Sequence, residues 1–403
     1  MFRTVSVRSC EESADDTLSY AGPDGAIMRV LSLSLDNSIL TDDGEPRQRQ
    51  QAYAERLEEY TVVVKTDRRV ETEIHDGALS VVPTRSRSRY HYLYDAYRLA
   101  ARELSTREYD VVTTQTPFAT GLIGWLLKRR FGVRLHTQVH IDFLNNAEWI
   151  ERTPEHRVFD RIARFCLPRS DAIRVGTFHE RTKIRRLVDE EIPVVVAPVS
   201  IDTESLVGET TAERRAEVSE EFDFGDRPVV LFAGRFVEQK DFATWMAVAE
   251  RVYTSMDSSP VFVLTGDGPL HSDVRRRFEQ QGMRDVIRMP GWVDRETLSA
   301  LYDLADVFLI TSHYEGTSRV IVEAGLNELP TVATPFAGAK DNISHGESGF
   351  IAEDVDQLAA YVQTVLTDAG ATTAFGQAAQ RQLADRFERE DLVESYVDFL
   401  SIQ

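Results

Sequence analysis

The sequence predicts an α/β protein with two doubly wound parallel sheets that face a central cleft. Short runs of β-branched residues alternate with helical patterns along the chain, which is typical of parallel strands joined by crossover helices. The alternation stops once, in a polar and acidic stretch near residues 203–226, and then starts again. Because 403 residues suffice for two or three domains, we expect each series to form a domain of its own.

The first series is expected to form a domain over residues 28–203. Residues 1–27 lack a hydrophobic period and are expected to be a loosely ordered extension. The strands of this domain are expected at Arg29–Leu33, Thr61–Val64, Val111–Thr114, Leu135–Val139, Ala172–Val175 and Val194–Pro198.

The second series is expected to form a domain over residues 204–385. Its strands are expected at Val229–Ala233, Val261–Thr265, Val286–Met289, Val307–Ile310 and Thr331–Ala333. After the first of these strands, apolar residues recur at the period of an α-helix, which indicates a helix with one buried face. They are Phe242, Trp245, Met246, Ala249 and Val252.

The charge balance disfavours one class of partner and suggests a habitat. Against 66 acidic residues stand 46 basic ones, a net charge of −20, so the phosphates of nucleic acid would be repelled. Five of the basic residues are lysines. Acid excess with few lysines predicts a salt-rich cytosol in which charges are screened, and an acidic mesophilic protein is the alternative. Cys10 and Cys166 provide no disulfide framework and no CxxC metal site, which indicates a reducing compartment.

The chain shows no sign of a membrane span or an export signal. No apolar run approaches the roughly 18–20 residues that a spanning helix requires. The first 27 residues carry several acidic side chains and no long apolar stretch. We therefore expect a cytoplasmic protein.

The loop after Val229–Ala233 is the first candidate site, because ligands of open parallel sheets bind beyond the carboxyl ends of the strands. It carries Gly234, Arg235 and Lys240 before a helix that opens at Asp241. A glycine allows a tight turn, and two cations at the positive end of a helix favour a diphosphate. A solvated basic pair on a loop is the alternative interpretation.

The loop after Val307–Ile310 is the second candidate. It contains Glu315, and the following helix, with Thr317 or Ser318 as its expected N-cap, contains Glu323. The unpaired amides of the first helical turn suit a diphosphate, and the carboxylates suit hydroxyl groups, those of a ribose in the case of Glu323. The alternative is a capping glutamate beside a surface glutamate.

Other strand ends supply weaker candidates. Gly266 belongs to a Gly-x-Gly-Pro turn, which is not a GxGxxG fingerprint because His271 stands at the third glycine position. Residues 290–293, which include Val293, end another strand and can offer backbone groups to a base. His140 follows a strand of the first domain and so lies at the cleft edge, although a lone histidine is often structural. With no Walker A loop, GxSxG elbow or zinc spacing, no cofactor and no metal are expected.

Together these residues resemble the retaining glycosyltransferases of family 4, which have the GT-B fold of two Rossmann-like domains. The resemblance covers most of residues 28–403 and is strongest over Val229–Ile351. It includes the Gly-Arg plus Lys loop, the Gly-x-Gly-Pro turn and the Glu-x7-Glu motif of the family, here Glu315 and Glu323. Residues 138–142, Gln-Val-His-Ile-Asp, resemble the Gln-Val-His-Thr-Asp stretch of members that act on lipid-linked sugars and exopolysaccharides.

The resemblance implies a role for each matching position. Arg235 and Lys240 would neutralise the diphosphate of a nucleotide-sugar donor. Glu315 would bind the donor sugar, which His140 would contact from the other domain, and Glu323 would bind the ribose. The other donor-binding positions would be Gly234, Gly266, Val293, Gly316, Thr317, Ser318, Arg319 and Val320, with Val293 holding the base through its backbone. A helix within residues 386–403 would cross back to the first domain.

The sequence departs from the family pattern in two places. Thr317-Ser318 replaces the commoner Phe-Gly, which alters how closely the backbone approaches the sugar. The usual Gly-Gly loop after the first strand is missing, and Arg47 and Arg49 follow there instead. These arginines are candidates to hold a phosphate of the acceptor, or they belong to an exposed helix start.

The implied function is retaining, metal-independent transfer of a hexose from a UDP- or GDP-sugar to an acceptor. The cationic pair would stabilise the leaving phosphate. The expected acceptor is a lipid-linked sugar or glycolipid at the inner face of the membrane. Residues 85–92 mix cations with aromatics and form either an interfacial contact or a solvated loop. The alternative functions are a nucleotide-sugar epimerase of the same fold and a non-catalytic transferase-like partner subunit.

Overall fold

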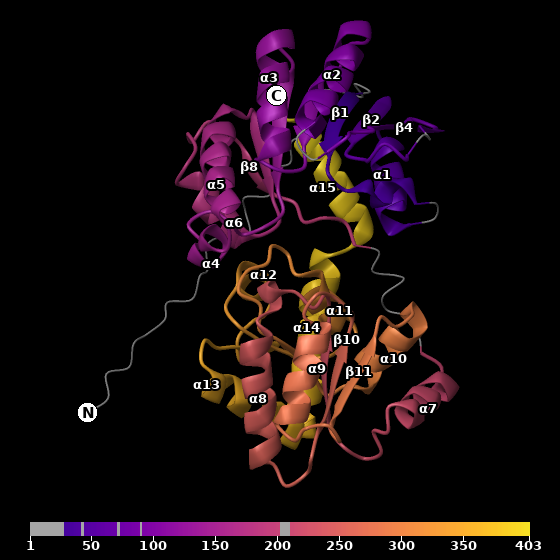
Figure 1. Cartoon of the computed structure of the whole chain (residues 1–403), viewed down its shortest axis with the longest axis vertical. Coiled ribbons are helices and arrows are strands. Elements are labelled where there is room, and N and C mark those ends of the chain that lie inside the picture. Colours follow the sequence, from indigo (N-terminus) through magenta and orange to yellow (C-terminus); the bar gives the residue numbers. More distant parts are fainter. Residues whose placement is uncertain (1–27, 42–43, 71–72, 89–90, 202–209) are drawn as a thin grey trace, which may run out of the picture.

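Two lobes, each built on one sheet, make up the part of the chain that the computed structural model describes (Figure 1). The described residues are 28–41, 44–70, 73–88, 91–201 and 210–403. The predicted extension over residues 1–27 lies outside them, as do the predicted domain boundary at residues 203–204 and residues 89–90 of the predicted interfacial segment.

The N-terminal lobe contains an eight-stranded sheet in the order β3-β4-β2-β1-β5-β6-β7-β8. Its neighbouring strands are parallel, apart from the antiparallel pair β3 and β4. Because the order reverses between β1 and β5, a crevice opens beyond the carboxyl ends of these two strands. The strands are β1 (Arg29–Ser34), β2 (Glu59–Val64), β3 (Ile74–Asp76), β4 (Leu79–Pro83), β5 (Val111–Thr114), β6 (Arg134–Val139), β7 (Ala172–Val175) and β8 (Val194–Val196).

Helices cover both faces of this sheet. Successive strand residues point to opposite sides, so each face carries apolar side chains that a helix buries. Val30 belongs to the hydrophobic cluster that includes α1, whereas Leu31 belongs to the cluster that includes α2 and α3. The helices of the lobe are η1 (Asn37–Leu40), α1 (Glu45–Ala54), α2 (His91–Thr106), α3 (Ala119–Phe131), α4 (Ala147–Glu151), α5 (Pro154–Cys166), η2 (Leu167–Arg169) and α6 (Phe178–Arg185).

The C-terminal lobe contains a six-stranded parallel sheet in the order β11-β10-β9-β12-β13-β14. Here the order reverses between β9 and β12, which places the second crevice at the ends of these strands. The strands are β9 (Val229–Ala233), β10 (Val261–Thr265), β11 (Ile287–Gly291), β12 (Val307–Ile310), β13 (Thr331–Ala333) and β14 (Gly349–Ile351). The helices are α7 (Ala212–Glu221), η3 (Glu238–Lys240), α8 (Phe242–Ser255), α9 (His271–Gln280), α10 (Arg295–Leu304), α11 (Arg319–Leu326), α12 (Ala337–Asn342), α13 (Val355–Thr367) and α14 (Ala369–Arg386). Among the helices described in either lobe, none is both long and apolar enough to cross a bilayer.

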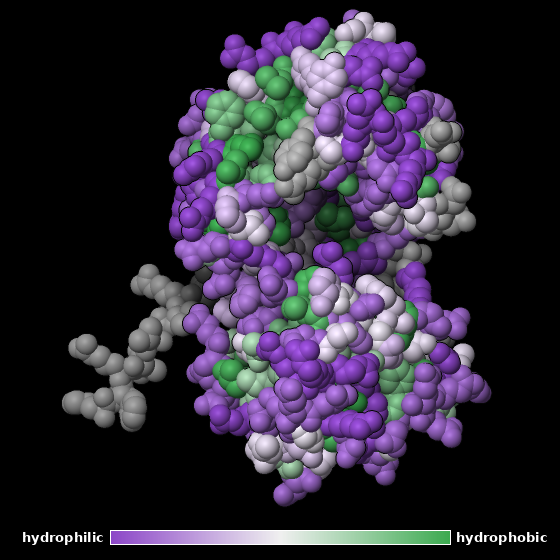
Figure 2. All heavy atoms as spheres, viewed as in Figure 1, coloured by the Kyte–Doolittle hydropathy of each residue, from purple (hydrophilic) through white to green (hydrophobic). Residues whose placement is uncertain are grey.

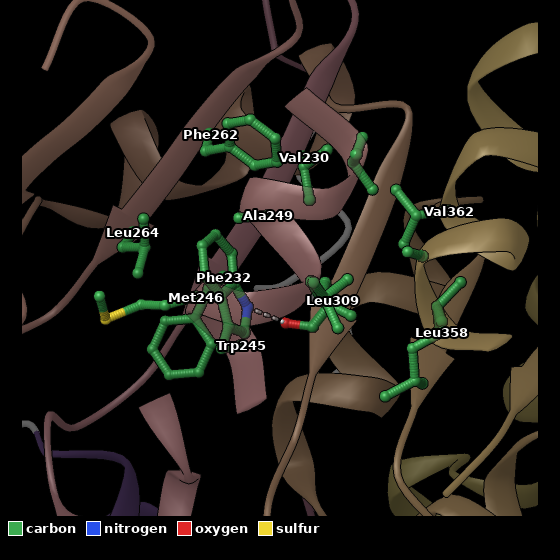
Figure 3. Close-up of a cluster of buried hydrophobic side chains, with 14 of the residues drawn as sticks. Val230, Phe232, Trp245, Met246, Ala249, Phe262, Leu264, Leu309, Leu358 and Val362 are labelled. Atoms are coloured by element: carbon green, nitrogen blue, oxygen red, sulfur yellow. Dashed lines mark hydrogen bonds between the residues drawn. The ribbon is translucent and has the colours of Figure 1, made fainter. Parts of the chain in front are cut away.

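Helix α8 fills the core of the C-terminal lobe (Figure 3). Its N-cap is Asp241, whose carboxylate accepts the backbone N–H of Thr244. The five periodic apolar residues of the sequence are all buried, which confirms the predicted helix face. Trp245 lies at its centre and donates its indole N–H to the carbonyl of Leu309 on β12 at 2.9 Å. This bond ties α8 to the strand that precedes the second candidate loop.

The predicted fold class, two doubly wound α/β domains, is confirmed, with local differences. Strands β3, β4 and β14 were not among the predicted elements. β3 and β14 have three residues each, and β4 pairs antiparallel with β3 and parallel with β2. The predicted polar break contains helix α7, whose one buried residue, Val218, provides no readable period. The predicted strand Val194–Pro198 ends at Val196.

Helix α15 (Arg389–Ser401) follows the C-terminal lobe but packs in the core of the N-terminal one. Figure 1 shows it, in yellow, among the indigo elements of the upper lobe. Tyr396 and Phe399 are buried beside Val30 and Val62, and the hydroxyl groups of Tyr396 and Tyr60 lie 3.2 Å apart. The chain therefore passes between the lobes twice.

Helix α14 holds helix α11 in place through close backbone packing. A Cβ atom at Gly325 of α11 would lie 2.3 Å from Leu383 of α14. A Cβ atom at Gly376 of α14 would lie 1.9 Å from the carbonyl oxygen of Glu328, directly after α11. Because α11 carries Glu323, this contact supports the candidate site from behind.

We expect Gly376→Ala to lower the free energy of unfolding by about 1–3 kcal/mol, because a backbone carbonyl cannot move aside as a side chain can. Gly370→Ala is the matched control in the same helix, where the added methyl group meets only Asp368 Oδ1 at 3.4 Å. That control is expected to be neutral or slightly stabilising because alanine favours helix. Urea unfolding followed by tryptophan fluorescence measures both, and equal midpoints for the two variants would contradict the packing described.

Candidate active site

A cleft of about 480 Å³ lies between the lobes, at the ends of β6, β9 and β12. Figure 2 shows a hollow between the two lobes on the face in view. The cleft is lined by Arg49, His140, Ile141, Val199, Ser200, Ile201, Gly234, Arg235, Val237, Gln239, Lys240, Glu315, Gly316, Thr317, Ser318, Arg319 and Val320. Both candidate loops of the sequence, and His140 from the other lobe, thus meet at one cavity.

The two loops of the C-terminal lobe are bonded to each other. Thr311, just after β12, donates its hydroxyl to the carbonyl of Lys240 at 3.0 Å. Gln239 donates its side-chain amide to the carbonyl of Tyr314 at 2.7 Å. These bonds run from the loop after β9 to the loop after β12, so the cations of one are fixed relative to the carboxylate of the other.

Lys240 and Glu315 form a buried ion pair at the floor of the cleft. Their side chains are 11% and 10% exposed, and Ser312 also donates to the same carboxylate oxygen at 2.6 Å. Burial opposes the ionisation of Glu315, but the charge of Lys240 and the hydrogen bonds prevail and lower its pKa below the ordinary value. Glu315 is therefore an oriented carboxylate at neutral pH.

Arg235 differs from Lys240 because its charge is not neutralised by the protein. Its side chain is exposed in the cleft, and no carboxylate of the described residues lies within 4.0 Å of it. Of the two cations in this loop, Lys240 is thus already bound to Glu315, whereas Arg235 faces the open cavity.

The segment from Glu315 to Ser318 is wedged between the lobes. A Cβ atom at Gly316 would lie 2.6 Å from the carbonyl oxygen of His140, so only glycine allows this approach. Asn342 of α12 donates to the carbonyl of Thr317 at 2.6 Å from the other side. Ser318 is the N-cap by position, but its side chain does not cap α11, and its backbone has a φ of 55°. The backbone of residues 315–318 is therefore held between the carbonyl group of His140 on one side and Asn342 on the other.

Glu323, which the family resemblance implies would bind the ribose, is not among the residues that line the cleft. It is buried, and both of its oxygens are bonded: Arg319 donates to one at 2.7 Å and the Tyr302 hydroxyl donates to the other at 2.9 Å. Arg319 also pairs at 2.5 Å with Glu45 of α1 in the other lobe. Burial first, and then the Glu323 charge, raise the pKa of Tyr302 well above its usual value, so that it stays a donor.

Three other predicted residues do not reach the surface of this cleft. Gly266 is buried beneath it with a φ of 117°, and a Cβ atom there would lie 2.0 Å from the carbonyl oxygen of Gly234. Val293 packs against the core of the C-terminal lobe. Arg47 pairs with Asp76 at 3.7 Å, whereas its neighbour Arg49 does line the cleft.

His140 faces the cleft from the end of β6 and is exposed to it. Although its ring is open to the cavity, the surrounding walls lower its pKa, and the positive charges of Arg174 and Arg49 lower it further. His140 is therefore neutral at pH 7. It is a hydrogen-bonding group rather than a third cation.

Sequence reasoning missed part of the wall. Val199, Ser200 and Ile201 line the cleft because they follow the carboxyl end of β8. The rule that ligands bind beyond the carboxyl ends of parallel strands, called the strand-end rule below, covers this position, but no reactive side chain there marked it in the sequence. Tyr302 was also missed, since a tyrosine in a helix gives no sign of its partner. Among the described residues, no group of three or more His, Cys, Asp or Glu side chains is arranged to hold a metal ion.

Comparison with known proteins identifies the family. Residues 51–205 match the family model described as Glycosyltransferase Family 4, and residues 214–382 match the one described as Glycosyl transferases group 1. The chain belongs to the family 4 glycosyltransferases with the GT-B fold.

Curated relatives match over part of their length. The alpha-D-kanosaminyltransferase of Streptomyces kanamyceticus is 26% identical over 260 residues, which cover 62% of this chain and 66% of that protein. The GDP-mannose-dependent alpha-(1-6)-phosphatidylinositol monomannoside mannosyltransferase of Mycobacterium tuberculosis is 26% identical over 252 residues, 59% of this chain and 65% of that protein. The chain thus spans just under two thirds of the length of these relatives.

Solved structures show the same fold across almost the whole chain. Sucrose-phosphate synthase from Thermosynechococcus elongatus has a TM-score of 0.76 at 18% identity, over 91% of this chain and 97% of that one. HepE from Anabaena, in complex with UDP, has a TM-score of 0.72 at 19% identity, over 93% of this chain and 100% of that one. At such identities the likeness is one of fold.

We expect Lys240→Met to lower the free energy of unfolding by about 3–5 kcal/mol at pH 7, because it leaves Glu315 buried without its cation. The double variant Lys240→Met/Glu315→Gln removes both charges and is expected to recover most of the loss. Urea unfolding at several pH values is the measurement.

The pH dependence has a definite sign. The lowered pKa of Glu315 stabilises the wild type at neutral pH, and this contribution is lost as the pH falls through that pKa. In Lys240→Met, burial favours the protonated carboxyl group, so acid relieves the cost and the gap between the two proteins narrows. A gap that does not change with pH would show that the ion pair is not its cause.

Proposed function

We propose that the chain is a retaining glycosyltransferase that moves a hexose from UDP- or GDP-hexose to a lipid-linked sugar or glycolipid. The observation that carries the proposal is the meeting of Arg235, Lys240 and Glu315 at one cleft, beyond the ends of β9 and β12. The likeness to a GDP-mannose-dependent mannosyltransferase and to a UDP-bound GT-B structure supports a nucleotide-sugar donor.

The donor diphosphate binds between Arg235 and the first turn of α11. Arg235 brings a charge that no carboxylate of the described residues neutralises, and α11 presents the unpaired amides of its N-terminus. Negative charge grows on the phosphate as the bond to the sugar breaks. Arg235, with Lys240 behind it, stabilises that charge more in the transition state than in the bound donor.

The donor sugar lies between Glu315 and His140. Lys240 fixes the orientation of the Glu315 carboxylate, which accepts hydrogen bonds from sugar hydroxyls. Among the cleft-lining residues that the structure describes, Glu315 is the one carboxylate, whereas double displacement requires two, about 5 Å apart. This favours transfer on one face of the sugar, with the proton of the acceptor hydroxyl passing to the departing phosphate oxygen.

The ribose binds to Glu323 by exchange. Arg319 now occupies one carboxylate oxygen of Glu323, and the two ribose hydroxyls replace that bond. Because Arg319 also pairs with Glu45 of the other lobe, donor binding breaks or rearranges a contact between the lobes. Nucleotide binding and movement of the lobes are coupled in this way.

We expect Arg235→Gln to slow turnover by about 10²–10³-fold, the loss that follows removal of one donor to a developing oxyanion. Arg284→Gln is the matched control, since Arg284 is exposed before β11, at the opposite end of the same sheet. Purified protein is mixed with UDP-, GDP- and ADP-hexoses, with and without a membrane lipid extract, and released nucleotide is measured by mass spectrometry. The assay contains molar KCl, because we also propose from the charge of −20 and the five lysines that the chain works in a salt-rich cytosol.

Several outcomes of this assay separate the alternatives. Isomerisation of the donor without nucleotide release would identify an epimerase, and donor binding without turnover would identify a non-catalytic subunit. Equal turnover in Arg235→Gln and Arg284→Gln would contradict the role of Arg235. Turnover abolished by EDTA would contradict metal independence, and an inverted anomeric configuration in the product would contradict retention.

A lipid acceptor requires contact with a membrane, and we propose the α3–α5 surface for it. Figure 2 shows apolar side chains gathered on the upper lobe over these helices. Leu126 and Val158 are 41% and 51% exposed. The ring centroids of Trp125 and Phe165 lie 4.9 Å apart. Arg129 lies over the ring of Trp125, and Arg169 lies over the ring of Phe165. Apolar side chains rimmed by arginines suit an anionic lipid surface.

The double variant Leu126→Ser/Val158→Ser is expected to reduce cosedimentation with vesicles that contain an anionic lipid by about tenfold, because two exposed apolar side chains leave the interface. Trp292→Ser is the control, since Trp292 is 68% exposed on the other lobe. Vesicle binding of the double variant equal to that of the wild type would rule out this surface as the membrane contact.

A further inference from the structure

A small polar arm leads from the cleft into the N-terminal lobe, toward the crevice where the strand order reverses between β1 and β5. It shares Arg49, His140 and Val199 with the cleft. Its volume is about 40 Å³, which holds about three water molecules. The arm is therefore too small for a sugar ring but large enough for one small polar group. Its walls are formed by Arg49, Gln50, Tyr53, Tyr60, Gln115, Gln138, His140, Arg174, Val199 and Tyr396.

The arm ends at a buried cation without a counter-ion. Arg174 of β7 is 2% exposed and donates to the carbonyls of Ala197 and Pro198, both at 2.6 Å, and to Gln138 at 3.0 Å. These partners are neutral, as is the ring of Tyr396, whose centroid lies 4.5 Å from the guanidinium carbon in a cation-π contact, and no carboxylate of the described residues lies within 4.0 Å of this guanidinium. A buried unpaired charge is costly, and a guanidinium has five N–H donors, more than these three bonds use.

Two buried polar atoms on the same wall also lack partners among the described residues. The hydroxyl of Tyr53 and the side-chain oxygen of Gln50 make no hydrogen bond, although these residues are only 2% and 8% exposed. Native proteins rarely leave buried polar groups unpaired. The hydroxyl of Tyr53 is a donor that faces a cavity next to a free positive charge.

A second arginine stands at the mouth of the arm. The side chain of Arg49 is 16% exposed, and its nearest carboxylate, Glu45 at 3.9 Å, is itself paired with Arg319. His140, at the boundary between arm and cleft, has its pKa lowered first by the surrounding walls, which limit its contact with water, and then by the charges of Arg174 and Arg49, which agrees with both charges facing this point. Among the residues described around the arm there are two cations and no carboxylate.

We propose that this arm binds an anionic group of the acceptor, a carboxylate or a phosphate, between Arg174 and Arg49. The inference rests on the proposed function and narrows it to acceptors whose receiving unit is acidic. The anion takes the spare donors of both guanidiniums and the Tyr53 hydroxyl. The ring that carries it then lies beside His140, where its hydroxyl faces the donor sugar. The anion provides the counter-charge that the protein omits.

The test measures binding of small probes to the full chain by calorimetry, without any donor and at one fixed KCl concentration. Glucuronate and glucose 6-phosphate are the anionic probes, and glucose is the neutral one. Both anions are expected to bind at least tenfold more tightly than glucose, and the tighter of the two identifies the carboxylate or the phosphate. Equal affinity for all three probes would overturn the inference.

Arg174→Gln would remove the buried cation directly, but loss of its three hydrogen bonds can also prevent folding. The test therefore uses two other variants, Arg49→Gln and Tyr53→Phe. Arg49→Gln, at the mouth of the arm, is expected to weaken anion binding at least tenfold, whereas Arg102→Gln, exposed on α2 of the same lobe, changes charge equally and is expected to have no effect. Tyr53→Phe is expected to raise the thermal midpoint of the empty protein, because an unpaired buried hydroxyl is removed, and yet to weaken anion binding. Anion binding that is insensitive to both Arg49→Gln and Tyr53→Phe would exclude the arm as the site.

Failure of this inference is distinguishable from failure of the proposed function. Anion binding with the expected variant pattern, but without donor turnover, would contradict only the transferase. Donor turnover onto neutral acceptors, without anion binding, would contradict only the acidic acceptor.

Discussion

The two lobes meet where backbone lies against backbone, at Gly316 and the carbonyl group of His140. A single added carbon at position 316 would lie 2.6 Å from that oxygen, so this contact sets how closely the ends of the two sheets approach each other. The width of the cleft depends on it. So does the juxtaposition of Glu315 and His140, which come from different sheets and are separated by about half the chain.

The sequence was most informative where the chemistry is local. Runs such as Val229–Ala233 and Val307–Ile310 match the observed strands residue for residue, because strands buried on both faces are apolar throughout. Once strands are located, the strand-end rule places Arg235 and Glu315 in one region without further information. Gly266 and Val293 follow strands as well, yet they lie under the cleft or beside it, since the rule does not say which loop residues face the ligand.

Other features depend on partners that are remote in sequence. Glu323 is held by Arg319 and Tyr302, and Arg319 in turn by Glu45, so its state follows from three elements in two lobes. Arg174, by contrast, carries a signal in the sequence itself. An arginine between Ile173 and Val175, inside a strand that is buried throughout, is a charge in an apolar run and indicates a functional position.

The molecule as a whole is strongly acidic, whereas its cleft is lined by basic residues. The whole chain carries −20, whereas the cleft and its arm concentrate Arg49, Arg174, Arg235 and Lys240. Long-range repulsion of an anionic ligand falls off within about 10 Å at 0.1 M salt and faster at higher salt. The short-range attraction inside a partly enclosed cleft is screened much less. High ionic strength therefore removes the barrier to approach and leaves the site itself effective.

The path of helix α15 has a consequence for the synthesis of the protein. Tyr396 and Phe399 complete the core of the N-terminal lobe, but the ribosome adds them after the entire C-terminal lobe. Domains generally fold in the order in which they are made, and here the lobe made first keeps an apolar surface uncovered until the residues of α15 have been added. The lobe made second is the first able to close its core. Chaperone demand during synthesis should thus fall on the N-terminal half, and a nascent chain stalled before residue 389 would expose it.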